Sequence, residues 1–250
     1  MQTKQFLLNG ILTSYLTSDN FNPEKSLFFL HGWGQDKSSF NKIYKLLDEK
    51  NISYIALDFP GFGASDFPKV DWKISDYAEF TKDFINRIGL VKPVLVGHSF
   101  GGRICIILGS SNYENLDKLV LIGAAGIKPK INILKYAIAK TGKLFFSIPG
   151  LQGIGDKIKS KVGSRDYVNS GKLKQIFLNT INEDLTPYLQ YINCKTLLLR
   201  GLNDTETPVA DGILMNNIIK NSRIKIFENG THFLHDELPE EIVEEIEKFI

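Results

Sequence analysis

Short apolar runs alternate with amphipathic segments along most of this chain. The runs have the length of strands and span 26–32, 52–58, 93–99, 116–124, 194–201 and 223–229. SLFFLHG (26–32) and ISYIALD (52–58) have few polar interruptions, as strands do when a parallel sheet buries them on both faces. Between them, the segments 38–50, 74–88 and 100–110 repeat apolar positions at helical spacing. This alternation predicts a mostly parallel, doubly wound α/β sheet with right-handed crossovers.

Two segments depart from the alternation. Near the N-terminus, Asn9-Gly10 separates two apolar runs, which predicts a tight hairpin. Between 127 and 185 there is no strong strand candidate, only lysine-rich helical patterns. We expect 127–185 to form a helical cap, or lid, inserted late in the sheet over the carboxyl ends of the strands, where such folds bind ligands. Residues 1–126 and 186–250 would then form the core domain.

Composition excludes several classes of protein. The chain has 250 residues, 43% of them hydrophobic, and a net charge of +2, which gives no argument for nucleic acid binding. Because no run approaches roughly 18 apolar residues, no transmembrane segment is expected. The N-terminus does not have the pattern of a signal peptide, so we expect a cytoplasmic protein. Cys105 and Cys194 lie in apolar segments and are predicted to be buried and unpaired.

The sequence GHSFGG (97–102) places Ser99 between an apolar run and a helical segment. The pattern Gly-x-Ser-x-Gly alone is weak evidence, since an ordinary turn can contain it. A nucleophilic serine on a sharp turn, however, needs a strand before it, a helix after it and small residues around it, and all three are present here. The amino terminus of the helix would also favour negative charge beside Ser99. We therefore predict that Ser99 is a nucleophile.

A nucleophilic serine needs a base, and the chain has four histidines. His98 precedes Ser99 on the same strand, so alternation should turn its side chain to the other face. His31 ends an earlier strand. His232 follows the last predicted strand and reaches the same edge of the sheet as Ser99, which makes it the predicted base. His235, three residues later, is expected to be a surface or hydrogen-bonding histidine.

The base must in turn be oriented by an acid. Asp204 lies just past the end of the strand 194–201 and is the predicted acid. Glu206 is deeper in the same loop and Asp211 falls in the next helix, so both are weaker alternatives. The segment after the strand 116–124 contains no carboxylate that could replace them.

Acyl transfer also needs donors for the developing oxyanion. HGWG (31–34) follows the strand 26–32, where a backbone amide could reach the same site. We predict that the backbone amides of Trp33 and Phe100 form the oxyanion hole. The alternative is that HGWG is a tight turn whose tryptophan packs in the core. A phosphate-binding loop is excluded, because no lysine followed by serine or threonine stands at the required spacing.

The order Ser99, Asp204, His232, with HGWG upstream, resembles the α/β-hydrolase superfamily, in its capped, esterase-like branch. The resemblance extends over nearly the whole chain and implies a serine hydrolase without metal or organic cofactor that acts on a small acyl substrate. Serine at 99 disfavours a dehalogenase, whose relatives carry aspartate there. Thr231 stands where many relatives have glycine. Cleavage of a carbon–carbon bond on the same triad is the alternative activity; a peptidase or a non-catalytic binding protein is disfavoured.

The expected cap is strongly basic. Residues 127–185 hold ten lysines and one arginine against four acidic residues. The simplest interpretation is a solvated lysine face. The alternative is a basic lid that attracts anionic substrates, an acidic acyl carrier or an anionic membrane surface.

Overall fold

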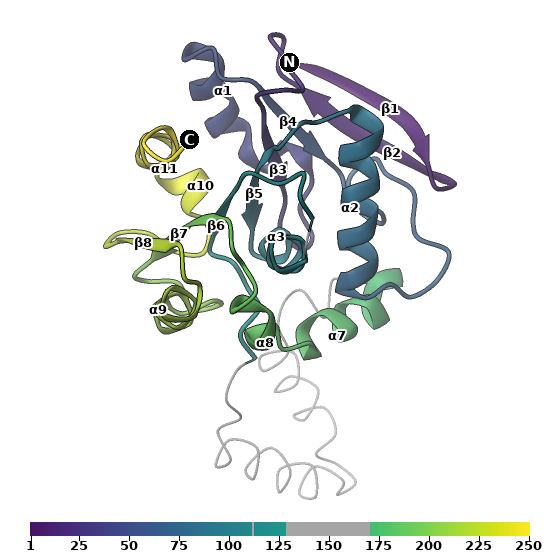
Figure 1. The fold of residues 1–250 in the computed structure, drawn as a ribbon. Helices are drawn as coiled ribbons and strands as arrows, with labels where there is room; N and C mark the ends of the chain where they lie inside the picture. Colours follow the sequence, from purple (N-terminus) through teal and green to yellow (C-terminus); the bar gives the residue numbers. More distant parts are fainter. Residues whose placement is uncertain (112, 129–170) are drawn as a thin grey trace, which may run out of the picture.

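The structure, a computed structural model, describes residues 1–111, 113–128 and 171–250. These residues form one eight-stranded sheet in the order β1-β2-β4-β3-β5-β6-β7-β8 (Figure 1). The strands are β1 (Gln2–Leu8), β2 (Ile11–Thr17), β3 (Leu27–Leu30), β4 (Tyr54–Leu57), β5 (Val94–His98), β6 (Lys118–Ile122), β7 (Lys195–Gly201) and β8 (Ser222–Phe227). The helices are α1 (Asn41–Glu49), α2 (Ile74–Ile88), α3 (Phe100–Ser110), α7 (Lys174–Asn182), α8 (Thr186–Leu189), α9 (Val209–Ile218), α10 (Leu234–Glu237) and α11 (Pro239–Glu247), with 3-10 turns η1 (Lys37–Phe40) and η2 (Gly171–Leu173).

The predicted parallel sheet and N-terminal hairpin are both confirmed. Strands β3 to β8 pair in parallel, whereas β2 pairs antiparallel with both β1 and β4. The hairpin turn has positive φ at both central residues, 51° at Asn9 and 78° at Gly10, as a tight turn between twisted strands requires. All the parallel strands therefore direct their carboxyl ends to one edge of the sheet, where loops from different parts of the chain meet.

Each face of the sheet has its own hydrophobic core. Along β3, Phe28 and Leu30 belong to one core and Leu27 and Phe29 to the other, as the alternation of strand side chains requires. Helices α2 and α3 cover the first face, and α1 and α11 cover the second (Figure 1). A sheet buried on both faces explains why its central strands are continuous apolar runs.

The final part of the expected cap packs onto this core. Most of the predicted cap, 129–170, lies outside the described residues, so the cap remains a prediction. In the described part, Leu173 and Ile176 join the core that contains α2 and α3. The Leu185 amide donates to the Gly126 carbonyl at 2.8 Å, so the chain leaves the core and returns to it at adjacent points.

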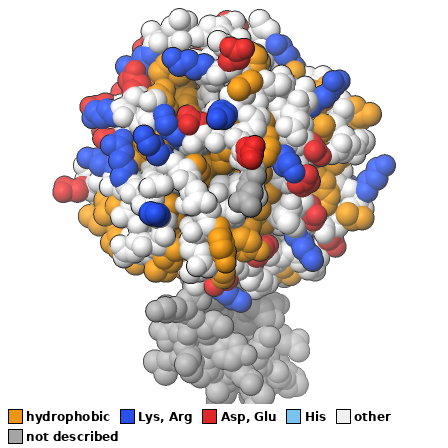
Figure 2. Space-filling model, viewed as in Figure 1, with side chains coloured by type: hydrophobic (Ala, Val, Ile, Leu, Met, Phe, Trp, Pro, Cys, Tyr) orange, Lys and Arg blue, Asp and Glu red, His pale blue; other side chains and the backbone are white. Residues whose placement is uncertain are grey.

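The surface of the described chain is mixed in charge. Figure 2 shows lysine, arginine, aspartate and glutamate side chains interspersed with apolar ones on the face that it presents. No helix of the described residues is long and apolar enough to cross a membrane. Cys105 is buried as predicted, whereas the prediction for Cys194 is wrong because this residue, just before β7, is only partly buried; both thiols are free.

Candidate active site

Ser99 stands at a strained turn between β5 and α3. Its backbone has φ 47° and ψ −104°, a combination that is unfavourable for a residue with a side chain. The turn is held because the Ser99 amide donates to the Ile122 carbonyl at 3.1 Å. Helix α3 also lies very close to β3, since a Cβ at Gly101 would overlap the carbonyl group of Leu30. A strained turn between a strand and a helix is the geometry predicted for Ser99, and it presents this serine at the edge of the sheet.

Asp204 lies in the loop after β7 and is buried among hydrogen-bond donors. Its Oδ1 accepts from the amides of Glu206 and Thr207 at 2.9 and 2.8 Å, and its Oδ2 accepts from the Thr207 hydroxyl at 2.7 Å. Burial alone would raise the pKa of Asp204, but the hydrogen bonds from His232 and Thr207 lower it below its usual value. Asp204 is therefore an ionised carboxylate with a fixed orientation.

His232 lies in the loop after β8 with its side chain almost fully buried. Its Nδ1 is 2.9 Å from Asp204 Oδ2, and because an ionised carboxylate can only accept, Nδ1 carries the proton and donates. Its Nε2 is 3.5 Å from Glu206 Oε2. The structure thus brings the predicted acid and base together, and it places Glu206, one of the weaker candidates for the acid, beside the other ring nitrogen.

A small pocket joins His232 to the serine. Among the residues described, its lining consists of Gly32, Trp33, Gln35, His98, Ser99, Glu206, His232 and Phe233. Ser99 Oγ has no hydrogen bond within the described part of the chain. Ser99 and His232 therefore face one pocket without being hydrogen-bonded to each other in this structure.

The backbone that follows β3 is oriented by His31. The Phe59 amide donates to His31 Nε2 at 3.0 Å, so in the neutral ring Nδ1 carries the proton and donates to the Gly32 carbonyl at 2.8 Å. Burial lowers the pKa of His31, although the bond to Gly32 opposes this, and the ring is therefore neutral. Because a trans peptide directs its C=O and N–H in opposite directions, the Trp33 amide points away from His31.

The two predicted oxyanion donors lie near this peptide. Within the described chain, neither the Trp33 amide nor the Phe100 amide donates to another group. The rings of Trp33 and Phe100 are in edge contact, with centroids 5.3 Å apart, and Phe177 of α7 lies 5.0 Å from the Trp33 ring. Trp33 thus fits both alternatives drawn from the sequence, because its ring is packed and its amide is free to donate to a ligand.

His98 is closer to the site than strand alternation predicts. Its Nε2 is 2.9 Å from the His232 carbonyl, which can only accept, so Nε2 is the protonated nitrogen. Burial, followed by the neighbouring histidines His235 and His232, keeps the pKa of His98 well below its usual value. His98 is the last residue of β5, where the chain begins its turn, and its ring lies against the loop of His232. It is placed to support that loop rather than to act as a base.

The prediction for His235 is wrong. Its side chain is only 1% exposed, and its Nδ1 has no hydrogen-bond partner among the described residues. The ring lies between Phe40 and His98, at centroid distances of 4.8 and 4.3 Å, because the short helix α10 packs against η1. Burial lowers the pKa of His235 to about 4.

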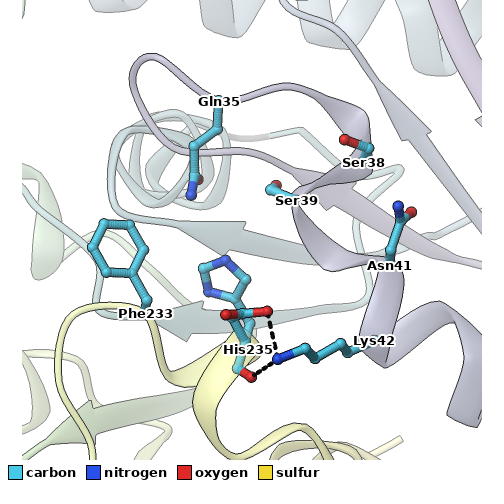
Figure 3. Close-up of a pocket in the computed structure, with 8 residues that line it drawn as sticks. Gln35, Ser38, Ser39, Asn41, Lys42, Phe233 and His235 are labelled. Carbon is cyan, nitrogen blue, oxygen red and sulfur yellow. Dashed lines mark hydrogen bonds and ion pairs between the residues drawn. The ribbon is translucent and has the colours of Figure 1, made fainter.

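Figure 3 shows a second, polar pocket. It shares Gln35 and Phe233 with the first pocket. Its other lining residues are Ser38, Ser39, Asn41, Lys42, His235 and Asp236. The positive charge at its edge is neutralised, since Lys42 Nζ is 2.9 Å from an Asp236 carboxylate oxygen. No group of three or more histidine, cysteine, aspartate or glutamate side chains in the described chain is arranged to hold a metal ion.

Comparisons with known proteins agree with this architecture. The family described as the alpha/beta hydrolase fold matches residues 25–140. A Mycoplasma pneumoniae protein provisionally named esterase/lipase 2 is 30% identical over 226 residues, which cover 83% of this chain and 82% of that protein. A monoglyceride lipase homolog of Monkeypox virus is 26% identical over 256 residues, which cover 91% of this chain and 90% of that protein.

Solved structures share the fold over nearly the full length. A bacterial membrane phospholipase A is 25% identical and superposes with a TM-score of 0.78 over 99% of this chain and 85% of its own. An esterase from Exiguobacterium antarcticum superposes with a TM-score of 0.73 at 24% identity over 96% of this chain and 94% of its own. The chain therefore belongs to the α/β-hydrolase family and is similar to members that are named as esterases and lipases.

Proposed function

We propose that this protein is a serine hydrolase that cleaves carboxylic esters or related acyl substrates. Ser99 is the nucleophile, His232 the base and Asp204 the acid that orients it. The observation that carries the proposal is the 2.9 Å hydrogen bond between His232 and a buried, ionised Asp204, at a pocket that also contains a serine on a strained elbow. The names of similar proteins, esterases and lipases, support the same class of reaction.

The reaction proceeds in two steps. Ser99 Oγ attacks the acyl carbonyl carbon while His232 Nε2 accepts the hydroxyl proton, and Asp204 stabilises the imidazolium that forms. His232 then gives the proton to the leaving alcohol, which departs as the ester bond breaks. Water, activated by His232, hydrolyses the acyl-enzyme and restores Ser99. In both steps the amides of Trp33 and Phe100 donate to the oxyanion.

The first step requires a hydrogen bond from the Ser99 hydroxyl to His232 Nε2, which accepts the proton. In the structure this nitrogen faces Glu206 Oε2 at 3.5 Å, and the Glu206 side chain is 55% exposed. Because 3.5 Å is longer than a normal hydrogen bond, Ser99 Oγ can become the partner of Nε2 while the Glu206 carboxylate stays in the lining of the pocket. Nδ1 can remain on Asp204 throughout, since that bond is buried.

Replacement of the nucleophile tests the proposal. With p-nitrophenyl butyrate as substrate, Ser99→Ala should lower kcat/KM by about 10⁴-fold or more. A fluorophosphonate probe should label the wild-type protein and not the variant. Ser110→Ala, near the other end of α3, is the matched control and should retain both activity and labelling. Equal hydrolysis by wild type and Ser99→Ala would contradict the proposal, and a wild-type protein that neither hydrolyses nor labels would indicate a binding protein.

A further inference from the structure

Glu206 occupies an unusual place for a carboxylate in a site that must stabilise an oxyanion. Its backbone belongs to the loop that holds the acid, since its amide donates to Asp204 Oδ1 at 2.9 Å. That bond fixes the backbone and directs the Glu206 side chain across His232 into the pocket that contains Ser99. The carboxylate therefore lies on the reactive side of His232, opposite the buried Asp204.

Among the described residues, the lining of the pocket has no positive side chain to balance this charge. Its described lining contains no lysine or arginine, and Glu206 is its one acidic residue. His98 does not supply a cation, because burial and the neighbouring histidines keep its pKa low. The other lining groups are the uncharged side chains of Gln35 and Ser99 and the aromatic rings of Trp33 and Phe233.

We infer that Glu206 sets the charge selectivity of the site, so that uncharged acyl substrates are preferred to those with a negative charge near the scissile ester. This inference rests on the proposed function, since it concerns the same pocket. An anionic group in the pocket would meet the Glu206 carboxylate at a distance at which like charges repel, and no described lining side chain would compensate. Because the Glu206 side chain is partly exposed, water and salt screen the repulsion, and the selectivity is moderate rather than absolute.

This prediction is opposite in sign to the one suggested by the basic segment 127–185. Lysines there would attract anionic substrates over a long range, and such attraction mainly raises the rate of encounter. Glu206 acts at the reacting bond and therefore on the ratio of kcat/KM between substrates that differ only in charge. A measurement of that ratio in the wild type and in a Glu206 variant separates the two effects, because the lysines are the same in both proteins.

The test uses two pairs of esters that are matched in shape. In the first pair the charge is on the acyl side, with p-nitrophenyl hydrogen adipate against p-nitrophenyl 6-oxoheptanoate. In the second it is on the leaving group, with 4-carboxyphenyl butyrate against 4-acetylphenyl butyrate. In Glu206→Gln, the anionic-to-neutral ratio of kcat/KM should rise by about fivefold for at least one pair at low ionic strength, and the rise should shrink in about 0.5 M salt.

Differences in intrinsic reactivity and any general effect on His232 cancel in this comparison of ratios. Glu228→Gln is the matched control, because it makes the same change of net charge in the loop after β8 on a residue that does not line the pocket, and its ratios should equal those of the wild type. Ratios that stay within about twofold of the wild type for both pairs in Glu206→Gln would overturn the inference. If the wild type hydrolyses none of the four esters, the proposed function itself fails, and this inference fails with it.

Discussion

Asp58 and Asp204 both lie just after a strand at the same edge of the sheet, but their carboxylates have different partners. Each follows a parallel strand, β4 for Asp58 and β7 for Asp204, and each is almost fully buried. Each also accepts two backbone amides, from Lys37 and Ala64 for Asp58 and from Glu206 and Thr207 for Asp204. Loops at this edge of the sheet therefore use a buried carboxylate as an anchor, whether or not chemistry occurs there.

The difference lies in the side chain that each carboxylate faces. Asp58 Oδ2 is 2.6 Å from Lys37 Nζ in a closed ion pair. Asp204 Oδ2 is 2.9 Å from an imidazole whose other nitrogen faces the Ser99 pocket. The first arrangement fixes a loop. In the second, under the proposed mechanism, the carboxylate stabilises the imidazolium that forms when His232 takes a proton. A carboxylate after a strand thus becomes a candidate for catalysis only when its partner can gain and lose a proton.

Of the changes that test this comparison, Asp204→Asn should have the largest effect on activity. The amide side chain cannot stabilise the imidazolium and can hold His232 in the wrong tautomer, so kcat should fall by about 10³- to 10⁴-fold with p-nitrophenyl butyrate. Asp211→Asn, which alters the other aspartate considered as the acid, is the control and should stay within about twofold of the wild type. Similar losses of kcat in the two variants would contradict the assignment of Asp204, rather than Asp211, as the acid.

Asp58→Asn should affect stability instead. The change leaves Lys37, whose side chain is only 14% exposed, without its counter-charge. We expect a loss of about 3 kcal/mol in the free energy of unfolding, measured with urea, while kcat/KM of the folded enzyme falls by less than about tenfold. The double variant Lys37→Met/Asp58→Asn should recover part of the stability. A large loss of activity with unchanged stability would show that Asp58 belongs to the chemistry.

Acidification should destabilise the fold in two separate ranges of pH. The pKa of His235 is lowered from 6.5 to about 4 in the folded state, so the unfolded chain binds the proton more readily. The contribution of neutral His235 to the free energy of unfolding is fully present above pH 6.5, and it falls by up to about 3 kcal/mol as the pH approaches 4. His98 acts in the same direction. Asp204, whose pKa is lowered from 3.8, contributes only below that value.

His235→Phe should reduce the loss of stability between pH 6.5 and 4 without abolishing it, because buried His98 still contributes there, and it should leave the loss below pH 3.8 unchanged. Denaturant unfolding at several pH values between about 4 and 7 gives the slope for each protein. The His98 contribution should remain in the variant. An identical slope in wild type and variant would mean that His235 does not titrate as its burial indicates.

The smallest expected effect concerns a glycine that lies against His232. Gly123 has φ 50°, and a Cβ there would lie 3.3 Å from the His232 carbonyl oxygen and 3.4 Å from its Nδ1. Gly10 also has positive φ, 78°, but a Cβ there would meet nothing within 4 Å. Both Gly→Ala variants should lose about 1 kcal/mol of stability to backbone strain. Only Gly123→Ala should also lose activity, by about tenfold, because it displaces His232.

Much of the fold was predictable because its central strands are buried on both faces. Such strands must be continuous apolar runs, and the helices between them must have one apolar side, so the order of elements can be read directly from the chain. The same reasoning predicted that the loops carrying Ser99, Asp204 and His232 would share one edge of the sheet. Their catalytic roles remain the proposal stated above.

The details of the site depended on the paths of the loops, which hydrophobic patterns do not encode. Thr207 donates to Asp204, and a threonine three residues after an aspartate was the signal available for that bond. The burial of His235 follows from the packing of α10, a helix too short to show a periodic pattern. The contact of Glu206 with His232 joins two loops that are separated by a helix and a strand. Neither the burial of His235 nor the contact of Glu206 with His232 could be predicted from a short sequence pattern.

The hydrogen bond between Leu185 and Gly126 also bears on how this protein could change over evolutionary time. The chain between them leaves and re-enters the core at one place, so its ends need not move when its length changes. The entropy of closing a loop grows only with the logarithm of its length, and a doubling costs about 0.6 kcal/mol. Selection can therefore change the length of this segment at low cost, provided that Leu173 and Ile176 stay in the core and Phe177 stays against Trp33. The same sheet can then be adapted to different substrates.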